Sequence, residues 1–267
     1  MLTFVGLGLY DERSVTVEGR EAIAGADRVV AEFYTSRLAG ASVADVEAFH
    51  GAEIEVRDRA GVEEDPDDLL ADAADRDVAF LTAGDPMIST THVDLRLRAR
   101  ERGIDTRVVH GTTAAAAAAS LTGLQNYRFG KATTLPFPHA GVDGVPDSVL
   151  ATVEDNRERG LHTLVYLDIA VDRGAAGYRD DDEPPYMTAD VAASLLSDGW
   201  DPDALGVAVC RAGGPDPVVD ADRLGALAGR SFGDPLHLLV LPGELHHVER
   251  EALAAFGDAP EDALPAE

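Results

Sequence analysis

The chain has 267 residues, 45% of them hydrophobic, which suffices for one large domain or two modest ones with an apolar core. Its single cysteine, Cys210, excludes an intramolecular disulfide and a cysteine-rich metal site and is typical of the reducing cytoplasm. No apolar run reaches the roughly 20 residues needed to span a bilayer, and no basic residue precedes Leu2. We therefore expect neither a membrane segment nor a signal peptide.

The charge is strongly negative, with 49 acidic residues against 22 Lys and Arg and a net charge of −27. The acidic residues are dispersed along the whole chain instead of forming one block. Dispersed carboxylates keep a protein hydrated at high salt, where the screening length falls to about 3 Å near 1 M. This composition predicts a protein of a halophile and argues against non-specific nucleic-acid binding, which needs basic patches.

Short apolar runs alternate with helical patterns along the chain, which predicts an α/β fold. The expected strands are, in chain order, residues 2–5, 28–32, 78–82, 106–110, 163–168, 205–211 and 236–241. The expected helices are residues 16–24, 42–49, 67–74, 91–102, 113–121, 149–159, 189–197, 223–228 and 248–256. We expect an N-terminal α/β domain at 1–111 and a C-terminal α/β domain at 112–267.

The first strand runs into Gly6-Leu7-Gly8, the beginning of a nucleotide-binding loop or simply a tight turn. A dinucleotide fingerprint requires a third glycine where this chain has Asp11, whose carboxylate would repel a pyrophosphate. No phosphate-loop Gly-Lys-Ser/Thr occurs either. The loop can approach a ligand closely, but it does not hold that ligand by phosphates.

Two later strand ends have comparable loops. Gly84-Asp85-Pro86 follows the strand at 78–82, and loops at the carboxyl ends of parallel strands are where α/β sheets bind ligands. The run 114–119 is all alanine, so a backbone or a flat ring can pack closely against the helix that it begins. Each segment could equally be a plain turn or a buried helix.

The C-terminal half offers weaker signals. His237 lies within an apolar strand and is either a packed core residue or a ligand contact. The pair His246-His247 lacks the i,i+4 spacing of a helical zinc site, so we expect no metal. A Gly-x-Ser-x-Gly elbow, which a serine hydrolase would need, does not occur.

Several segments together resemble the diphthine synthases, a group of tetrapyrrole-methylase-like (class III) S-adenosylmethionine methyltransferases. They are VGLGLYDERSVTVEG, AEFYTS, FLTAGDPMISTTH, GLHTLVYLDI and FGDPLHLLVLPGELH, which extend the resemblance from Leu2 to about Val248. The resemblance implies the tetrapyrrole methylase fold, with two α/β domains and S-adenosyl-L-methionine in the cleft between them. It also implies a homodimer. From the composition we expect a cytoplasmic protein that binds neither nucleic acid nor a membrane.

The implied substrate is translation elongation factor 2. On this protein a histidine bearing an aminocarboxypropyl group is methylated on its amine, up to the trimethylated diphthine, with S-adenosyl-L-homocysteine as the second product. In archaeal members of the family the amine becomes a trimethylammonium, and the halophilic composition favours this product. Cofactor contacts carry over to the following positions: Leu9, Asp85, Ile88, Thr113, Ala114, Leu167, Ala212 and His237.

The absence of a phosphate cradle agrees with S-adenosylmethionine, which has no phosphate, and Asp11 or Asp85 would attract its sulfonium. We expect no nucleophilic residue, because the protein supplies mainly alignment and a water-poor site. The amine must lose a proton before each further methylation, and either a carboxylate near the cleft or water accepts it, so we name no general base. Arg13, Arg37 and Arg211 are candidates for the substrate carboxylate. The alternatives are a corrin or tetrapyrrole methyltransferase and a non-catalytic nucleotide-binding module.

Overall fold

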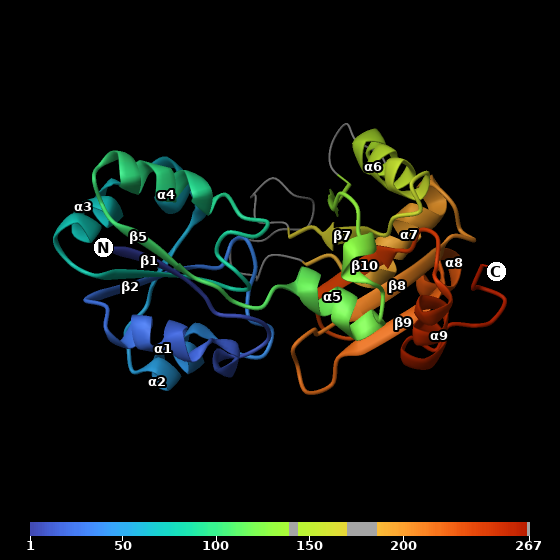
Figure 1. Cartoon of the computed structure of the whole chain (residues 1–267), viewed down its shortest axis with the longest axis horizontal. Coiled ribbons are helices and arrows are strands. Elements are labelled where there is room, and N and C mark those ends of the chain that lie inside the picture. The colour runs from blue at the N-terminus through green and yellow to red at the C-terminus, as the bar shows by residue number, and fades with distance from the viewer. Residues whose placement is uncertain (139–143, 170–185, 266–267) are drawn as a thin grey trace. The chain divides into compact units, whose positions relative to one another are not determined.

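The computed structural model describes residues 1–138, 144–169 and 186–265. The chain divides into two compact units, Met1–Ala114 and Ala115–Glu267 (Figure 1). Each expected helix and strand within the described residues is present, and its ends lie within two residues of the expected ones. Each unit contains one five-stranded sheet, which confirms the α/β fold class.

The first unit has a fully parallel sheet with the order β3-β2-β4-β1-β5. Its strands are β1 (Leu2–Gly6), β2 (Arg28–Glu32), β3 (Glu55–Arg57), β4 (Val78–Thr82) and β5 (Thr106–Val109). Because the strands are parallel, β1, β4 and β5 all end at the same edge of the sheet. The loops that follow these three neighbouring strands therefore meet there.

Helices cover both faces of this sheet (Figure 1). They are α1 (Val17–Ala24), α2 (Val43–His50), α3 (Asp67–Asp75) and α4 (His92–Glu101). On one face Ile23 of α1 and Val46 of α2 pack with the strands. On the other face Leu69 of α3 and Leu95 of α4 do the same. Burial on both faces explains why β1 and β4 are continuous apolar runs.

Local sequence signals fix where these helices begin and end. The Thr16 side chain accepts a hydrogen bond from the Gly19 amide, so α1 has a conventional N-cap. Ser42 and Asp45 form a capping box at the start of α2. Gly51 ends α2 in the left-handed conformation, with φ of 67°. Such caps explain why these boundaries were predictable from the sequence.

The second unit has a mixed sheet with the order β6-β7-β10-β8-β9, in which β10 is antiparallel to both neighbours. Its strands are β6 (Thr133–Leu135), β7 (Thr163–Leu167), β8 (Leu205–Cys210), β9 (Val218–Arg223) and β10 (His237–Leu241). Its helices are α5 (Ala114–Thr122, beginning at the unit boundary), α6 (Asp147–Arg157), α7 (Ala189–Gly199), α8 (Leu224–Leu227) and α9 (His247–Phe256). Short helical turns lie at Glu12–Ser14, Ala60–Glu64 and Asn126–Arg128.

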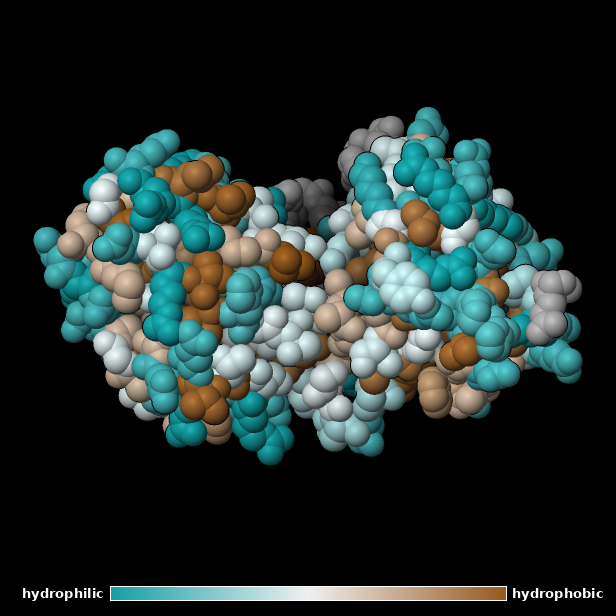
Figure 2. Space-filling view, in the orientation of Figure 1, coloured by the Kyte–Doolittle hydropathy of each residue, from teal (hydrophilic) through white to brown (hydrophobic). Residues whose placement is uncertain are grey.

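One core cluster holds the second unit together. Val153 of α6, Leu196 of α7 and Leu224 of α8 pack with buried strand residues such as Val165 and Leu239. The visible surface of both units is largely hydrophilic, with apolar patches of limited extent (Figure 2). No helix within the described part of the chain is long and apolar enough to cross a membrane.

Candidate functional site

Three loops meet at the carboxyl edge of the first sheet. Gly8, after β1, and Gly84, after β4, form an isolated antiparallel bridge. The Gly8 amide donates to the Gly84 carbonyl at 3.1 Å, and the Gly84 amide donates to the Gly8 carbonyl at 2.7 Å. Backbone groups therefore hold together the two loops that the sequence singled out.

Glycine is required where these loops cross. A Cβ on Gly6 would lie 2.5 Å from the Gly111 amide nitrogen, and a Cβ on Gly111 would lie 2.1 Å from the Gly84 carbonyl oxygen. Gly84 differs, because its φ is 76° and a Cβ there would meet nothing within 4 Å. Gly6 and Gly111 are therefore packing glycines, whereas Gly84 borders open space into which a ligand can approach the backbone.

Asp85 organises this edge. Its carboxylate is only 4% exposed and accepts hydrogen bonds from three donors. These are His110 Nδ1 at 2.7 Å, the Met87 amide at 2.9 Å and the Gly111 amide at 3.3 Å. The buried carboxylate thus joins the loop after β4 to the loop after β5.

The other expected contacts of the first unit lie on the same loops. Leu9 is half-buried, and its carbonyl accepts a hydrogen bond from the Asp11 amide at 3.0 Å. Ile88 is 49% exposed although it is apolar. Thr113 and Ala114 are half-buried and follow Gly111, with Ala114 beginning α5. All of these residues therefore belong to the carboxyl edge.

Sequence reasoning missed several residues of this edge, among them His110, which bonds Asp85 and is itself 77% exposed. The available signal was its position directly after β5, next to Gly111. Asp11, which we expect near the cofactor sulfonium, forms an ion pair with Arg13 at 2.8 Å. One of the three candidate arginines is therefore already neutralised by its neighbour.

A buried pair, Glu32 and His92, lies behind the Gly-Asp-Pro loop. Glu32, the last residue of β2, accepts from the Thr35 amide at 3.0 Å and the Thr35 hydroxyl at 2.5 Å. His92, the first residue of α4, contacts the Pro86 carbonyl oxygen through Nδ1 at 3.1 Å. Because a carbonyl only accepts, Nδ1 bears the proton and Nε2 a lone pair. This Nε2 lies 3.4 Å from Glu32 Oε1 without the alignment of a hydrogen bond.

Burial shifts the pKa values of this pair in opposite directions. Loss of water raises the pKa of Glu32 despite the bonds from Thr35. Loss of water also lowers the pKa of His92. Both shifts favour neutral side chains, and His92 in that state supports the backbone of the loop that contains Asp85.

The three expected contacts in the second unit lie at one edge of its sheet. In the register, His237 is opposite Cys210 and Leu238 is opposite Tyr166. The first residue of β10 therefore meets the last residues of β7 and β8. Leu167 ends β7, and Ala212 follows β8 by two residues. The antiparallel pairing thus gathers Leu167, Ala212 and His237.

Both ring nitrogens of His237 are occupied by backbone partners. Nδ1 accepts from the Ala189 amide at 3.1 Å, and Nε2 lies 2.9 Å from the Asp234 carbonyl oxygen, to which it donates. Burial lowers the pKa of His237, in keeping with a neutral ring. Its ring therefore fixes α7 and the 233–235 turn, and a ligand would meet its backbone or ring edge.

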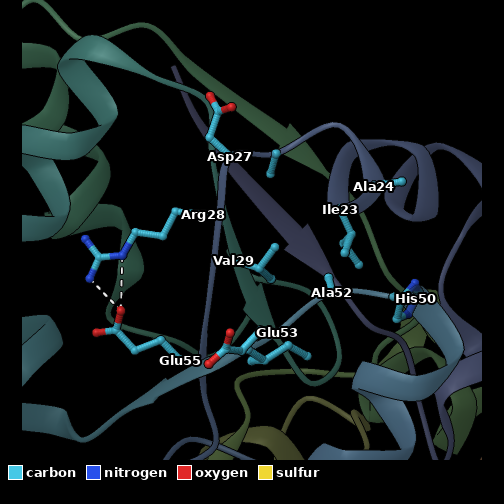
Figure 3. A pocket seen from close by; sticks show the side chains of 12 residues that line it. Ile23, Ala24, Asp27, Arg28, Val29, His50, Ala52, Glu53 and Glu55 are labelled. Carbon is cyan, nitrogen blue, oxygen red and sulfur yellow. Dashed lines mark hydrogen bonds and ion pairs between the residues drawn. The ribbon is translucent and has the colours of Figure 1, made fainter.

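A separate cavity of about 630 Å³ lies at the amino ends of β2 and β3 (Figure 3). Figure 3 shows Arg28 paired with Glu55 at its edge, with an N···O distance of 2.6 Å. Arg28 also pairs with Asp68 and Asp72. Of the residues that the structure describes, Arg28 is the only arginine that lines this cavity, and its guanidinium is paired with three carboxylates. The cavity is therefore poorly suited to a phosphate.

Comparisons with known proteins identify the family. The profile of the Tetrapyrrole (Corrin/Porphyrin) Methylases matches residues 1–227. A diphthine synthase of Halorubrum lacusprofundi is 71% identical over 265 residues, covering 99% of each chain. The chain belongs to the diphthine synthases of the tetrapyrrole methylase family. A second diphthine synthase, from Halobacterium salinarum, is 69% identical and covers 99% of this chain and all of its own.

A solved diphthine synthase structure has the same fold. It superposes with a TM-score of 0.87 at 37% identity, covering 98% of both chains. The two diphthine synthase sequences come from haloarchaea, which agrees with the expectation from the acidic composition. The family profile ends before β10, but the full-length diphthine synthases include the region that contains His237.

Proposed function

We propose that the chain catalyses the S-adenosyl-L-methionine-dependent methylation of elongation factor 2 in diphthamide biosynthesis. The methyl acceptor is the amine of an aminocarboxypropyl group on a histidine, which is trimethylated to diphthine. The observation that carries the proposal is 71% identity to a diphthine synthase over nearly the full length of both chains. At this identity and coverage, an activity different from that of the relative would need a rebuilt site.

The residues fit the proposed cofactor. Gly84 leaves space above the backbone, and neither Gly-rich loop offers a lysine to a phosphate. We propose that Leu9, Asp85, Ile88, Thr113 and Ala114 of the first unit contact it. We propose the same for three residues of the second unit, which are Leu167, Ala212 and His237.

The cofactor, when bound, supplies an activated methyl group, so this chain needs no nucleophile of its own. The chain contributes orientation: the Gly8–Gly84 bridge and the Asp85 carboxylate fix the loop backbone before a ligand binds. Well-oriented reactants gain roughly 7–11 kcal/mol over a bimolecular encounter. Apolar side chains such as Leu9 and Ile88 would keep water away from the reacting groups.

Calorimetry on Asp85→Ala tests the cofactor contacts. Removal of the carboxylate leaves His110 and two backbone amides without their acceptor, so we expect S-adenosyl-L-homocysteine affinity to fall more than about tenfold. Asp94→Ala, which removes an exposed ion pair with Arg98 on α4, is the control and should bind nearly normally. Equal affinities for wild type and Asp85→Ala would refute the assignment.

A methylation assay tests the substrate. Mass spectrometry should find up to three added methyl groups on elongation factor 2 that carries the aminocarboxypropyl histidine. The control acceptor is a precorrin, because the family also includes corrin and porphyrin methylases. Methylation of the precorrin alone would replace our proposal with the corrin alternative.

We further propose that the enzyme is a cytoplasmic homodimer. The family resemblance supports the dimer, and the location of its substrate, a translation factor, supports the cytoplasm. Light scattering in concentrated KCl should give twice the mass of 28.1 kDa. A mass of one chain at micromolar concentration would exclude the dimer.

A further inference from the structure

A hollow of about 520 Å³ lies beside the proposed cofactor contacts of the second unit. It is formed by the end of β8, the start of β9 and the turn before β10. Its lining includes Arg211, Asp220, Phe232, Gly233 and Asp234. No residue to which the family resemblance assigns a contact lines it, although Arg211 directly precedes Ala212 and its amide donates to the Leu236 carbonyl at 2.9 Å.

Arg211 is held in place by backbone atoms. Its Nη1 donates to the Phe232 carbonyl at 2.6 Å, and Nη2 lies 3.5 Å from the Asp216 carbonyl. Within the part of the chain that the structure describes, Arg211 forms no ion pair with a carboxylate. A guanidinium has five N–H donors, so several of them remain available to a ligand.

The backbone is specialised for this placement. Arg211 has φ of 51°, a left-handed conformation that non-glycine residues adopt uncommonly. Gly233 has φ of 79°, and a Cβ there would lie 3.0 Å from Arg211 Nη1. A larger residue at 233 would crowd the guanidinium, so both positions favour this one orientation.

The hollow also contains negative charge. Asp220 pairs with Arg230 and is therefore committed to the protein. The exposed carboxylate of Asp234 forms no hydrogen bond or ion pair with any described residue. One available cation and one available anion thus border the same space, a combination that suits a zwitterion better than a simple anion.

We propose that this hollow binds an α-amino-acid group, with Arg211 taking its carboxylate and Asp234 accepting a hydrogen bond from its amino group. This inference rests on the proposed function, because that function supplies two ligands with an α-amino-acid group. One is the aminocarboxypropyl group of the modified histidine, and the other is the methionine part of the cofactor. Arg211 would act as a binding residue, because a guanidinium can form two parallel hydrogen bonds to a carboxylate.

Binding measurements on Arg211→Ala test the proposal and separate the two sources. The probes are S-adenosyl-L-homocysteine, which has the amino-acid group, and 5′-methylthioadenosine, which lacks it. If the group belongs to the cofactor, affinity for the first falls about tenfold and affinity for the second is unchanged. If it belongs to the protein substrate, both affinities are unchanged and KM for elongation factor 2 rises by a similar factor.

Two other results would overturn the proposal. Equal weakening of both probes would show a general structural effect, and unchanged affinities with an unchanged KM would show that the hollow binds neither group. If wild type binds S-adenosyl-L-homocysteine without methylating elongation factor 2, the proposed function fails. In that case the difference between the affinities of Arg211→Ala for the two probes still tests whether the hollow binds an amino-acid group.

Matched variants guard against misfolding. Arg250→Ala is the control, because the Arg250 guanidinium also donates to a backbone carbonyl, that of Pro265, but does not line the hollow. It should keep wild-type affinities and KM. Arg211→Lys retains the charge without the fork and should fall between wild type and Arg211→Ala. Asp234→Asn should weaken the same interaction less, since its carboxylate is exposed.

Discussion

Each unit contains a glutamate–histidine pair that is fully buried, and the two pairs are built differently. In the second unit Glu249 accepts from the Gln125 amide at 2.8 Å, the His246 amide at 2.9 Å and His162 Nε2 at 3.0 Å. Arg128 adds a guanidinium at 3.4 Å. In the first unit Glu32 accepts from the Thr35 amide and hydroxyl and also from the Tyr34 amide and the Thr82 hydroxyl, and His92 faces it without an aligned hydrogen bond.

The electrostatic consequences are opposite. Burial would raise the pKa of Glu249, but the two backbone amides and His162 outweigh it and lower that pKa. At Glu32 burial dominates and raises the pKa. The Glu249 carboxylate has a guanidinium among its donors and joins segments up to 124 residues apart. The donors to Glu32 are neutral groups, and Glu32 and His92 lie behind the Gly-Asp-Pro loop. Among the described residues, the buried glutamate without a guanidinium donor is thus the one near the candidate site.

The largest expected effect is on stability. Glu249→Gln removes the charge to which these donors point, so we expect a loss of about 1.5–3 kcal/mol in the free energy of unfolding. Glu32→Gln should cost less than about 1 kcal/mol, because its amide can donate to the Thr35 hydroxyl and His92 Nε2. Chemical denaturation in concentrated KCl measures both. Equal losses would erase the distinction between the pairs.

The next effect concerns the loop that His92 supports. His92→Phe keeps the ring packing against Phe80 but loses the hydrogen bond to the Pro86 carbonyl. We expect S-adenosyl-L-homocysteine affinity to fall roughly fivefold, the equivalent of about 1 kcal/mol. His92→Asn can restore a donor near Nδ1 and should recover part of the affinity. If His92→Phe binds as wild type does, the pair has no role in the site.

The smallest effect is the pH dependence of stability. Since the folded pKa of Glu32 is raised, wild type should lose stability relative to Glu32→Gln as pH rises from about 4.3 through the folded value. Since the folded pKa of Glu249 is lowered, wild type should keep its full advantage over Glu249→Gln above about 4.3 and lose it as pH falls. Unfolding curves should therefore give slopes of opposite sign, below about pH 4.3 for the Glu249 comparison and above about pH 4.3 for the Glu32 comparison. Slopes of the same sign would contradict the assigned protonation states.

Much of this fold could be predicted because its signals are local. Apolar runs such as β1 and caps such as Ser42 depend only on neighbouring residues. The strands that sequence reasoning missed are short or carry charges, as in β3 (Glu55–Arg57), the three-residue β6 (Thr133–Leu135) and β9 (Val218–Arg223). Strands β3, β6 and β9 all lie at sheet edges, where one-sided pairing tolerates polar residues and weakens the pattern.

The sequence by itself determined the two α/β halves, the family and the glycine-rich strand ends, because each follows from residues close together in the chain. Only the tertiary structure decided what the polar side chains do. Asp85 meets His110 from 25 residues away, and His237 meets the amide of Ala189 from 48 residues away. Hydrogen bonding and burial of these side chains depend on which distant segments the sheets bring together. No local sequence pattern predicts which segments meet.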